Sequence, residues 1–312
     1  MKVNLRLADP DVRRMSSCFD ETIASMSKGF CQLGHEIGVG GIDIVFGFHM
    51  NPREITHRSI IYQQEPVSPK TLSEGNVPIS YLKNHIVWDY SRHNVSLLQS
   101  HDVKAIYVPN GYAGTLDDPT RICPDAQCID ILFYGNCTEY RRKILEALKA
   151  RKLKVVEVFG LYHTDLDELL QKSKVILNMH NEREYHSLES VRILRCLVNR
   201  KAVVSEINED DDDDDLGKFV RGVPYGKLVD ACVDLVNDRD ERRRLESLSV
   251  ECLRLRSQKD ILSLALQSLV GRDNLGGRII LPDPPQVIKS RKRLRYAKDG
   301  LTLDWNNMYH RG

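Results

Sequence analysis

The sequence predicts an α/β protein built from two doubly wound domains that face each other across a central cleft. Three observations support this prediction. The chain has 312 residues, which exceeds one comfortable core. Short β-branched strands alternate with polar helical stretches in both halves, and one loop rich in Asp and Pro, around residues 117–125, interrupts the alternation. We therefore predict domains over residues 1–122 and 123–270, and a tail over 271–312 that could cross back to the first domain.

Composition is that of an ordinary soluble protein, with 41% hydrophobic and 29% charged residues. No stretch approaches the 18 consecutive apolar residues of a membrane span, and the first residues run into charge where a signal peptide would be apolar. We therefore expect a cytoplasmic protein. The net charge of +1 creates no overall attraction to nucleic acid or lipid. The 8 cysteines contain no CxxC pair, so we expect reduced thiols and no metal.

The first half contains five predicted strands and two predicted helices. The strands are apolar or β-branched and most end in turn or polar residues, while the helices repeat apolar residues at helical spacing. This alternation indicates βαβ units and a mostly parallel sheet. The expected strands are 3–9, 41–50, 59–66, 85–91 and 104–112, and the expected helices are 18–34 and 91–101.

The second half repeats this pattern with higher regularity. Open α/β sheets bind ligands beyond the carboxyl ends of their strands, and polar residues cluster at those ends here, so we predict that this half is the binding domain. The expected strands are 129–135, 153–160, 174–180 and 201–206, the expected helices are 138–151, 165–172 and 187–199, and a short strand and two helices follow within 223–256. The polar residues at strand ends are Tyr134, Gly135, Asn136, Asn178, His180, Ser205 and Glu206.

Six consecutive aspartates, Asp210 to Asp215, follow the last of these strands. Adjacent like charges repel one another, and blocks of them are usually solvated. The run therefore predicts an exposed loop rather than a metal site.

Residues 174–206 hold the densest functional signal. A buried strand delivers Asn178 and His180 to its end, and a helix is expected to open near Ser187 with Glu189 in its first turn. A helix N-terminus suits a diphosphate, and a carboxylate there can accept hydrogen bonds from a ribose. An acidic first turn also stabilises a helix without any ligand, so both interpretations stay open. Glu189 and Arg192 share one helical face. The opposite face, expected to point to the core, contains Val191, Leu194 and Val198.

This segment resembles the donor-binding segment of group 1 glycosyltransferases from bacteria and phages, the branch that includes the CgeB-like proteins. The residues that carry the resemblance are Asn178, His180, Glu189, Arg192, Ser205 and Glu206. The stretches YGNCTEYRRKILEAL, VPYGKLVDACVDL, IIYQQEP and VWDYSRHN extend it to roughly residues 40 to 255. Glu182 and Glu189 stand seven positions apart, one fewer than in the best-known relatives, which leaves the stereochemistry open.

The resemblance implies a GT-B fold of two Rossmann-like domains and a hexosyltransferase-like activity. The donor would be a nucleotide-sugar, with UDP expected, and the reaction would need neither a metal nor a cofactor. By the same resemblance, Glu189 would bind the donor ribose, while Arg192 with Arg141 or Arg142 would neutralise the departing diphosphate. A solvated helix face explains Arg141 and Arg142 equally well. The rest of the implied donor pocket is Gly135, Asn178, His180 and Ser205.

The acceptor hydroxyl must face the donor across the cleft, so a general base is expected from the first domain. The candidates at its strand ends are His49, Glu65 and Asp89. The acceptor is expected to be a surface polysaccharide, a lipid-linked glycan or a small hydroxyl compound.

Two alternatives stay open beside this function. The first is a phage-type enzyme that glycosylates a modified base in DNA, for which the tail offers nine Lys or Arg against four Asp over residues 271–312. The second is a catalytically silent protein of the same fold that binds nucleotides or sugars. A dehydrogenase is disfavoured, because no GxGxxG motif follows a predicted strand.

Overall fold

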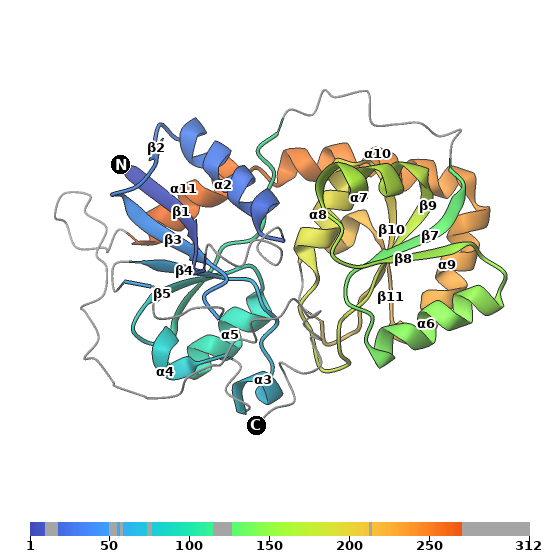
Figure 1. Ribbon diagram of the computed structural model, residues 1–312, viewed down its shortest axis with the longest axis horizontal. Coiled ribbons are helices and arrows are strands. Elements are labelled where there is room, and N and C mark those ends of the chain that lie inside the picture. Colours follow the sequence, from blue (N-terminus) through green and yellow to red (C-terminus); the bar gives the residue numbers. More distant parts are fainter. Residues whose placement is uncertain are drawn as a thin grey trace, which may run out of the picture.

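The computed structural model describes residues 1–9, 18–49, 55–56, 59–73, 77–114, 127–211 and 214–269. Within these ranges the chain forms two parallel β-sheets that lie side by side, each with its own helices (Figure 1). The predicted fold class is therefore confirmed. The boundary predicted between residues 122 and 123 and the tail predicted over 271–312 lie outside the described residues.

The first sheet has six parallel strands in the order β2-β1-β3-β4-β5-β6. All five predicted strands and both predicted helices of this half are present. The additional elements, β2, α3 and α4, have only two to five residues, which is too short for a periodic pattern. The strands are β1 Lys2–Leu7, β2 Glu36–Ile37, β3 Ile42–Phe46, β4 Ile60–Gln63, β5 Ile86–Asp89 and β6 Lys104–Tyr107; the helices are α2 Asp20–Gln32, α3 Pro69–Ser73, α4 Ile79–Leu82 and α5 Arg92–Ser100.

The second sheet has five parallel strands in the order β11-β10-β9-β7-β8. The strand order reverses between β7 and β9, so the crevice at their carboxyl ends is the switch point where such sheets bind ligands. The strands are β7 Ile129–Tyr134, β8 Val155–Val158, β9 Ser173–Asn178, β10 Ala202–Glu206 and β11 Arg221–Val223; the helices are α6 Glu139–Ala150, α7 His163–Lys172, α8 Ser190–Val198, α9 Leu228–Asn237 and α10 Arg239–Leu255.

Both faces of the second sheet are covered by helices, and alternate residues of each strand supply the two cores. On one face Phe133 and Leu177 pack against apolar residues of α6 and α9. On the other face Leu132 and Ile176 pack against apolar residues of α7 and α8. This two-sided burial explains why the strands are nearly continuous apolar runs in the sequence.

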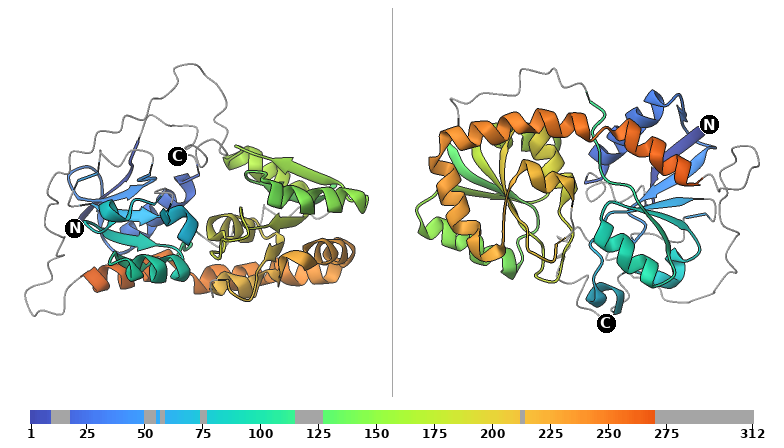
Figure 2. Two further views of the ribbon diagram at one scale, coloured as in Figure 1. Left: turned by 90° about the horizontal axis from the view of Figure 1, so that it is seen from below. Right: turned by 180° about the vertical axis from the view of Figure 1, so that it is seen from behind.

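The chain returns to the first domain through α11, Gln258–Leu269. Leu262 and Leu269 of α11 join the core cluster that contains Met26 and Phe30 of α2. Figure 2 shows α10 and α11 following one another across the two domains. A Cβ at Gly29 of α2 would lie 2.9 Å from Leu262 Cδ1, so the two helices pack closely at this glycine. The return to the first domain thus takes place at α11, within the range 123–270 predicted for the second domain and before the tail predicted over 271–312.

Helix α8 corrects two expectations. It begins at Ser190, so Glu189 occupies the N-cap position and not the first turn. Its core-facing side chains are Ile193, Cys196 and Leu197, which are fully buried. The stripe expected in the core, formed by Val191, Leu194 and Val198, is only half buried. Both stripes are apolar at helical spacing, so the sequence pattern alone could not decide which one packs on the sheet.

None of the helices in the described ranges is both long and apolar enough to cross a lipid bilayer.

Candidate functional site

The candidate site lies at the carboxyl edge of the second sheet, where β7, β9 and β10 end. The structure brings together seven of the eight predicted donor-binding residues there: Gly135, Arg141, Asn178, His180, Glu189, Arg192 and Ser205. The eighth, Arg142, lies outside the group. It is exposed on α6, and its Nε is 3.9 Å from Glu139 Oε2. Of the two adjacent arginines, only Arg141 points inward.

Glu189 stands at the centre of this group. Its Oε1 accepts a hydrogen bond from Arg141 Nη2 at 3.2 Å, and its Oε2 accepts one from Asn178 Nδ2 at 3.1 Å. His180 Nδ1 lies 3.4 Å from Oε2. Burial alone would raise the pKa of Glu189, but the charges of His180, Arg192 and Arg141 outweigh it and lower that pKa to about 2. Glu189 is therefore a carboxylate held ready to accept further hydrogen bonds.

Arg141 holds the end of β9 in place. Its side chain is 3% exposed, and its five N–H groups all have acceptors. Nε donates to His180 O at 2.9 Å, Nη1 donates to Asn136 O and Asn181 Oδ1, and Nη2 donates to Met179 O and Glu189 Oε1. Burial, together with the nearby Arg192 charge, lowers the pKa of Arg141 to about 10, so it stays charged at neutral pH. Because no N–H is left over, Arg141 positions Glu189 and has no donor for a diphosphate.

Arg192 offers the accessible cation of the site. It is half buried, and its Nη1 donates to Asn178 Oδ1 at 2.8 Å. Its guanidinium lies over the rings of Phe133 and Tyr134, at 5.8 and 5.6 Å from their centroids. Nη2 faces Gly135, where a Cβ would come within 2.7 Å of it. Gly135 also has a φ of +138°, so both the backbone and the arginine require glycine at this turn.

His180 is fully buried between two carboxylates. Its Nε2 lies 2.8 Å from Asp211 Oδ2, and its Nδ1 faces Glu189. Its backbone N–H donates to Glu206 Oε2 at 3.0 Å. Burial lowers the pKa of His180, but Glu189 and Asp211 outweigh this effect and raise it to about 10. His180 is therefore a fixed cation next to Glu189.

The involvement of Asp211 corrects the prediction that the acidic run is an exposed loop. Asp211 is 2% exposed and pairs with His180, while buried Asp214 accepts two hydrogen bonds from Arg256, at 2.7 and 3.0 Å. Asp210 and Asp215 are exposed, and residues 212–213 lie outside the described ranges. Two buried cations thus draw two of these carboxylates inward. In the part of the chain that the structure describes, no His, Cys, Asp or Glu cluster is arranged to hold a metal.

A stacked pair of tyrosines adjoins this group through Glu206 and was missed by the sequence analysis. Tyr140 and Tyr225 stack with ring centroids 4.1 Å apart, and Tyr225 OH donates to Tyr140 O. Tyr140 OH donates to Glu206 Oε1 at 2.5 Å. Ser205 Oγ accepts from Asn178 Nδ2 at 2.9 Å. Tyr140 stands beside Arg141 in the sequence, but nothing there connects it with Tyr225, which lies 85 positions away.

The three candidate bases of the first domain differ in access. His49 and Glu65 form a loose pair, with Nε2 and Oε1 3.8 Å apart and side chains 24% and 31% exposed. Asp89 has no exposed surface, and it accepts hydrogen bonds from Ser91 N at 2.8 Å and Asn94 Nδ2 at 3.1 and 3.2 Å. The geometry gives Asp89 a role in fixing the turn after β5, whereas His49 and Glu65 are partly accessible.

A buried network of hydroxyls and amides joins the two domains on either side of Glu189. Ser187 Oγ donates to Asn94 Oδ1 at 3.0 Å and lies 2.7 Å from Ser91 Oγ. Asn110 Nδ2 donates to Ser190 Oγ at 2.8 Å. These bonds fix the segment that contains Glu189 with respect to the first domain.

Tyr90 is influenced by charged groups of both domains. Its pKa is raised well above the usual value, first by burial and then by the charges of Asp89, Glu189 and Glu65. Glu65 of the first domain and Glu189 of the second therefore both act on this one side chain. The side chains of the candidate base and of Glu189 thus both lie within electrostatic reach of Tyr90.

Sequence comparison finds relatives of this chain but no matching family model. The chain is 28% identical to the uncharacterized protein L140 of Acanthamoeba polyphaga mimivirus over 166 residues, which are 51% of this chain and 53% of that protein. It is 34% identical to the mimivirus protein L138 over 103 residues, 32% of this chain and 12% of that protein. The chain thus spans about half of the first relative and less of the second, and the CgeB-like grouping stays a prediction.

Among solved structures, a DNA-modifying β-glucosyltransferase studied with and without uridine diphosphoglucose superposes with a TM-score of 0.58 at 11% identity, covering 86% of this chain and 99% of that one. The lipopolysaccharide glycosyltransferase WaaG superposes with a TM-score of 0.55 at 8% identity, covering 87% and 100%. The chain has the GT-B fold of these glycosyltransferases.

Proposed function

We propose that this protein is a metal-independent glycosyltransferase that takes a sugar from a nucleotide-sugar, with UDP as the nucleotide, and transfers it to a hydroxyl acceptor. The observation that carries the proposal is Glu189. It is an ionised carboxylate at the N-cap of α8, at the switch point of a GT-B domain, where three buried side chains orient it. The complexes of two neighbours with UDP-glucose support the choice of UDP.

On the donor side, different residues are proposed to bind the ribose and the diphosphate. Glu189 accepts hydrogen bonds from the ribose hydroxyls, and Arg192 together with the first amides of α8 faces the diphosphate. Negative charge grows on the diphosphate as the bond to the sugar breaks, so a fixed cation and fixed dipoles lower the barrier. Arg141 takes the part of a positioning residue, in place of the diphosphate contact that the resemblance implied.

On the acceptor side, Glu65 is the proposed base, with His49 as its neighbour. The acceptor hydroxyl gives its proton to Glu65 while its oxygen attacks the anomeric carbon. The bonding electrons leave with the nucleoside diphosphate. Glu65 suits this task because its side chain is partly exposed and its pairing with His49 is loose.

Calorimetric titration of UDP, GDP and UDP-sugars into the wild type and Glu189→Gln tests the donor site. We expect one nucleotide to bind the wild type and the variant to lose about a hundredfold in affinity, because a carboxylate oriented by neighbouring cations is replaced by a neutral group. Glu184→Gln is the matched control, since Glu184 lies in the same loop but pairs at 3.4 Å with surface Lys70. Binding of no nucleotide would overturn the proposal. Binding without hydrolysis or transfer by the wild type would favour the non-catalytic alternative.

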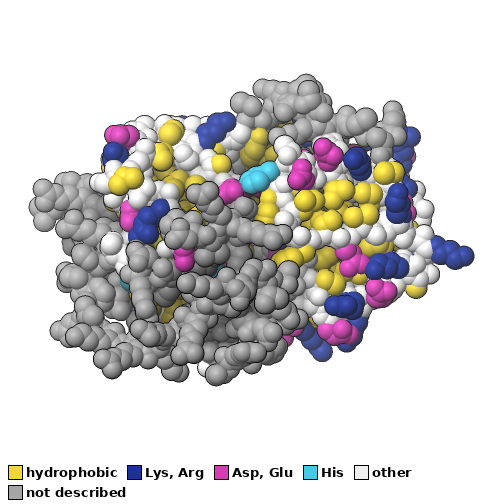
Figure 3. Space-filling model, viewed as in Figure 1, with side chains coloured by type: hydrophobic (Ala, Val, Ile, Leu, Met, Phe, Trp, Pro, Cys, Tyr) yellow, Lys and Arg dark blue, Asp and Glu magenta, His cyan; other side chains and the backbone are white. Residues whose placement is uncertain are grey.

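DNA is the second candidate acceptor. Two structural neighbours with the same fold are the DNA-modifying β-glucosyltransferase and the T4 phage enzyme BGT with its UDP-glucose substrate, the latter with a TM-score of 0.51 at 13% identity. On the face drawn in Figure 3, acidic and basic side chains of the second domain are interspersed, so no single-sign patch there attracts a polyanion. The basic residues of 271–312 are then the expected contacts.

Gel-shift titration of duplex DNA at 50 and 200 mM salt distinguishes the two acceptor classes. If DNA is the acceptor, the affinity falls steeply with salt, and truncation after residue 270 lowers both the affinity and the slope. Binding that is absent at both salt concentrations would remove DNA and leave glycans and small acceptors.

A further inference from the structure

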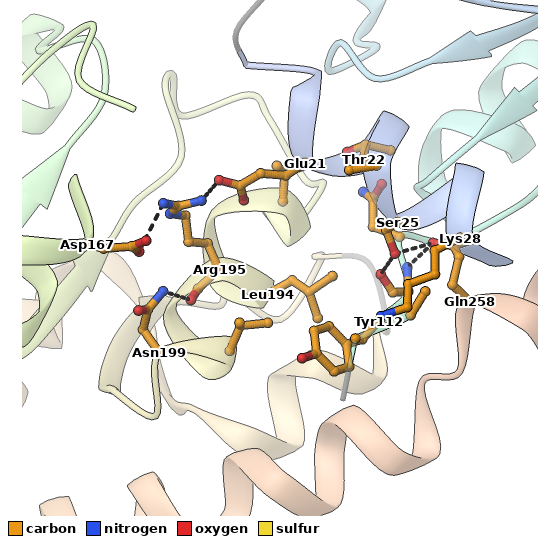
Figure 4. A pocket seen from close by; sticks show the side chains of 17 residues that line it. Glu21, Thr22, Ser25, Lys28, Tyr112, Asp167, Leu194, Arg195, Asn199 and Gln258 are labelled. Atoms are coloured by element: carbon orange, nitrogen blue, oxygen red, sulfur yellow. Dashed lines mark hydrogen bonds and ion pairs between the residues drawn. The ribbon is translucent and has the colours of Figure 1, made fainter. Parts of the chain in front are cut away.

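A cavity of about 310 Å³ lies between α2 and α8, beside the two places where the chain passes between the domains, at residues 110–114 and at Gln258 (Figure 4). Its volume is at the lower end of the range of small-molecule sites. Asn110 lines it and donates to Ser190, the residue that follows Glu189. The cavity therefore shares one hydrogen bond with the candidate donor site, but none of its lining residues belongs to that site.

One wall of the cavity is the apolar stripe of α8 that the sequence analysis expected in the core. Val191, Leu194 and Val198 are half buried and border this space. Ala24 of α2 and Ala113 of the first crossing also line it. A helix with a second apolar face gains stability when that face is covered, so the stripe favours an apolar ligand body.

Three side chains that line the cavity each contain one buried polar atom without a hydrogen-bond partner in the described part of the chain. Gln258 is fully buried; its Oε1 accepts from Gly111 N at 2.9 Å, whereas its Nε2 has no hydrogen-bond partner among the residues the structure describes. Asn199 Oδ1 and Arg195 Nε are buried without a partner in the same sense. Buried polar groups are rarely left unpaired, and three such atoms belong to side chains that line this one cavity. All three atoms are shielded from the cavity, so the polar side chains that a ligand can reach are found elsewhere in the lining.

The charges of the cavity are unequal at its two ends. Arg195 pairs with both Glu21 and Asp167, the latter at 2.9 Å, so one cation faces two carboxylates there. Lys28, on the opposite side in Figure 4, is exposed and makes no ion pair within the described ranges. An anionic group would be repelled at the Arg195 end and attracted at the Lys28 end.

We propose that this cavity binds a small amphipathic carboxylate of the medium-chain fatty acid class. Its carboxylate lies toward Lys28 and Ser25, and its apolar body lies along Val191, Leu194 and Val198. The walls come from α2, α8 and both crossings, so an occupied cavity holds the two domains in the arrangement seen here. The site is independent of the sugar donor and can be tested whether or not the protein is a glycosyltransferase.

Calorimetric titration of decanoate into the full chain, with decanol as the uncharged comparison, tests the proposal. Decanoate is expected to bind saturably to the wild type. Leu194→Trp should abolish binding because the indole fills the cavity, and Val191→Phe serves as a second filling variant if that protein is unstable. Lys28→Met should weaken decanoate about two- to fivefold, the usual effect of one exposed charge, without changing the affinity for decanol.

Two matched controls make the outcome decisive. Leu264→Trp places the same indole at a leucine on α11 that is 67% exposed, and Lys143→Met removes an exposed lysine on α6. Both should bind decanoate as the wild type does. Absence of saturable binding to the wild type, or equal binding to folded Leu194→Trp or Val191→Phe, would overturn the proposal.

Discussion

The carboxyl edges of the two sheets use their charged side chains in opposite ways. At the second sheet Arg141 and His180 are buried, and they lie 3.2 and 3.4 Å from Glu189, whose side chain is 18% exposed. At the first sheet His49 and Glu65 are 3.8 Å apart and partly exposed. The first arrangement is fixed before any ligand arrives, which suits a ligand whose charge is always the same. The second leaves the Glu65 carboxylate accessible and loosely paired, as the proposed role of base requires.

Removing Arg141 should have the largest effect on the fixed edge. Arg141→Met leaves Glu189 and three backbone carbonyls without their donor, so we expect a loss of about 3–5 kcal/mol in the free energy of unfolding. Arg142→Met, one position along the same helix, should change it by less than about 0.5 kcal/mol. Urea unfolding of the two variants measures the contrast. Equal losses would show that the inward arginine does not carry the edge.

Glu65→Gln tests the partly exposed carboxyl edge of the first sheet without disturbing the residues around Glu189 at the second sheet. The variant loses a base but disturbs only a loose, partly exposed pair. We expect transfer or donor hydrolysis to fall about a hundredfold, with nucleotide affinity and stability unchanged. Asp89→Asn is the informative comparison, because Asp89 is buried and hydrogen-bonded, so its variant should lose stability first. Unchanged turnover in Glu65→Gln would move the search for a base to His49.

The sequence was sufficient for most of the strands and helices and for most of the residues gathered around Glu189. Strand ends and their polar residues are local features, so Asn178, His180 and Glu189 could be located from the pattern alone. Asp211 and Tyr225 could not, because only the folding of the loop after β10 and the start of α9 brings them to the site. The choice between Arg141 and Arg142 was equally inaccessible, since two adjacent basic residues fit the helical period in either phase.

The pH dependence of the free energy of unfolding should reveal the charged groups around Glu189 directly. The pKa of Glu189 is lowered to about 2, so its contribution is present above about pH 4.5 and is lost as the pH falls toward 2. The pKa of His180 is raised to about 10, so its contribution is present below about pH 6.5 and is lost as the pH rises toward 10. Each loss should exceed about 1.4 kcal/mol, the equivalent of one pKa unit.

Asp211→Asn should reduce the alkaline loss and leave the acid loss largely in place. The substitution removes one of the two carboxylates that raise the pKa of His180, whereas Glu189 keeps Arg141 and Arg192. Urea unfolding at a series of pH values measures the loss of stability on the acid side and on the alkaline side for each protein. An equal loss on the alkaline side in the variant and the wild type would mean that Asp211 does not stabilise the imidazolium.

The smallest expected effect lies where the two edges meet. Ser187→Ala removes the hydroxyl that donates to Asn94 and contacts Ser91 across the domain interface. One neutral hydrogen bond contributes about 1 kcal/mol, so the free energy of unfolding should fall by about that amount. Glu189 keeps its three partners, so nucleotide affinity should hardly change. The rate of transfer should fall several-fold, because the loop that leads to Glu189 is less firmly held against the first domain. Ser247→Ala, at an exposed serine on α10, is the control, and its kinetics should match the wild type. A rate unaffected by Ser187→Ala would show that the remaining contacts between the domains, such as the one between Asn110 and Ser190, are sufficient to hold Glu189 in place.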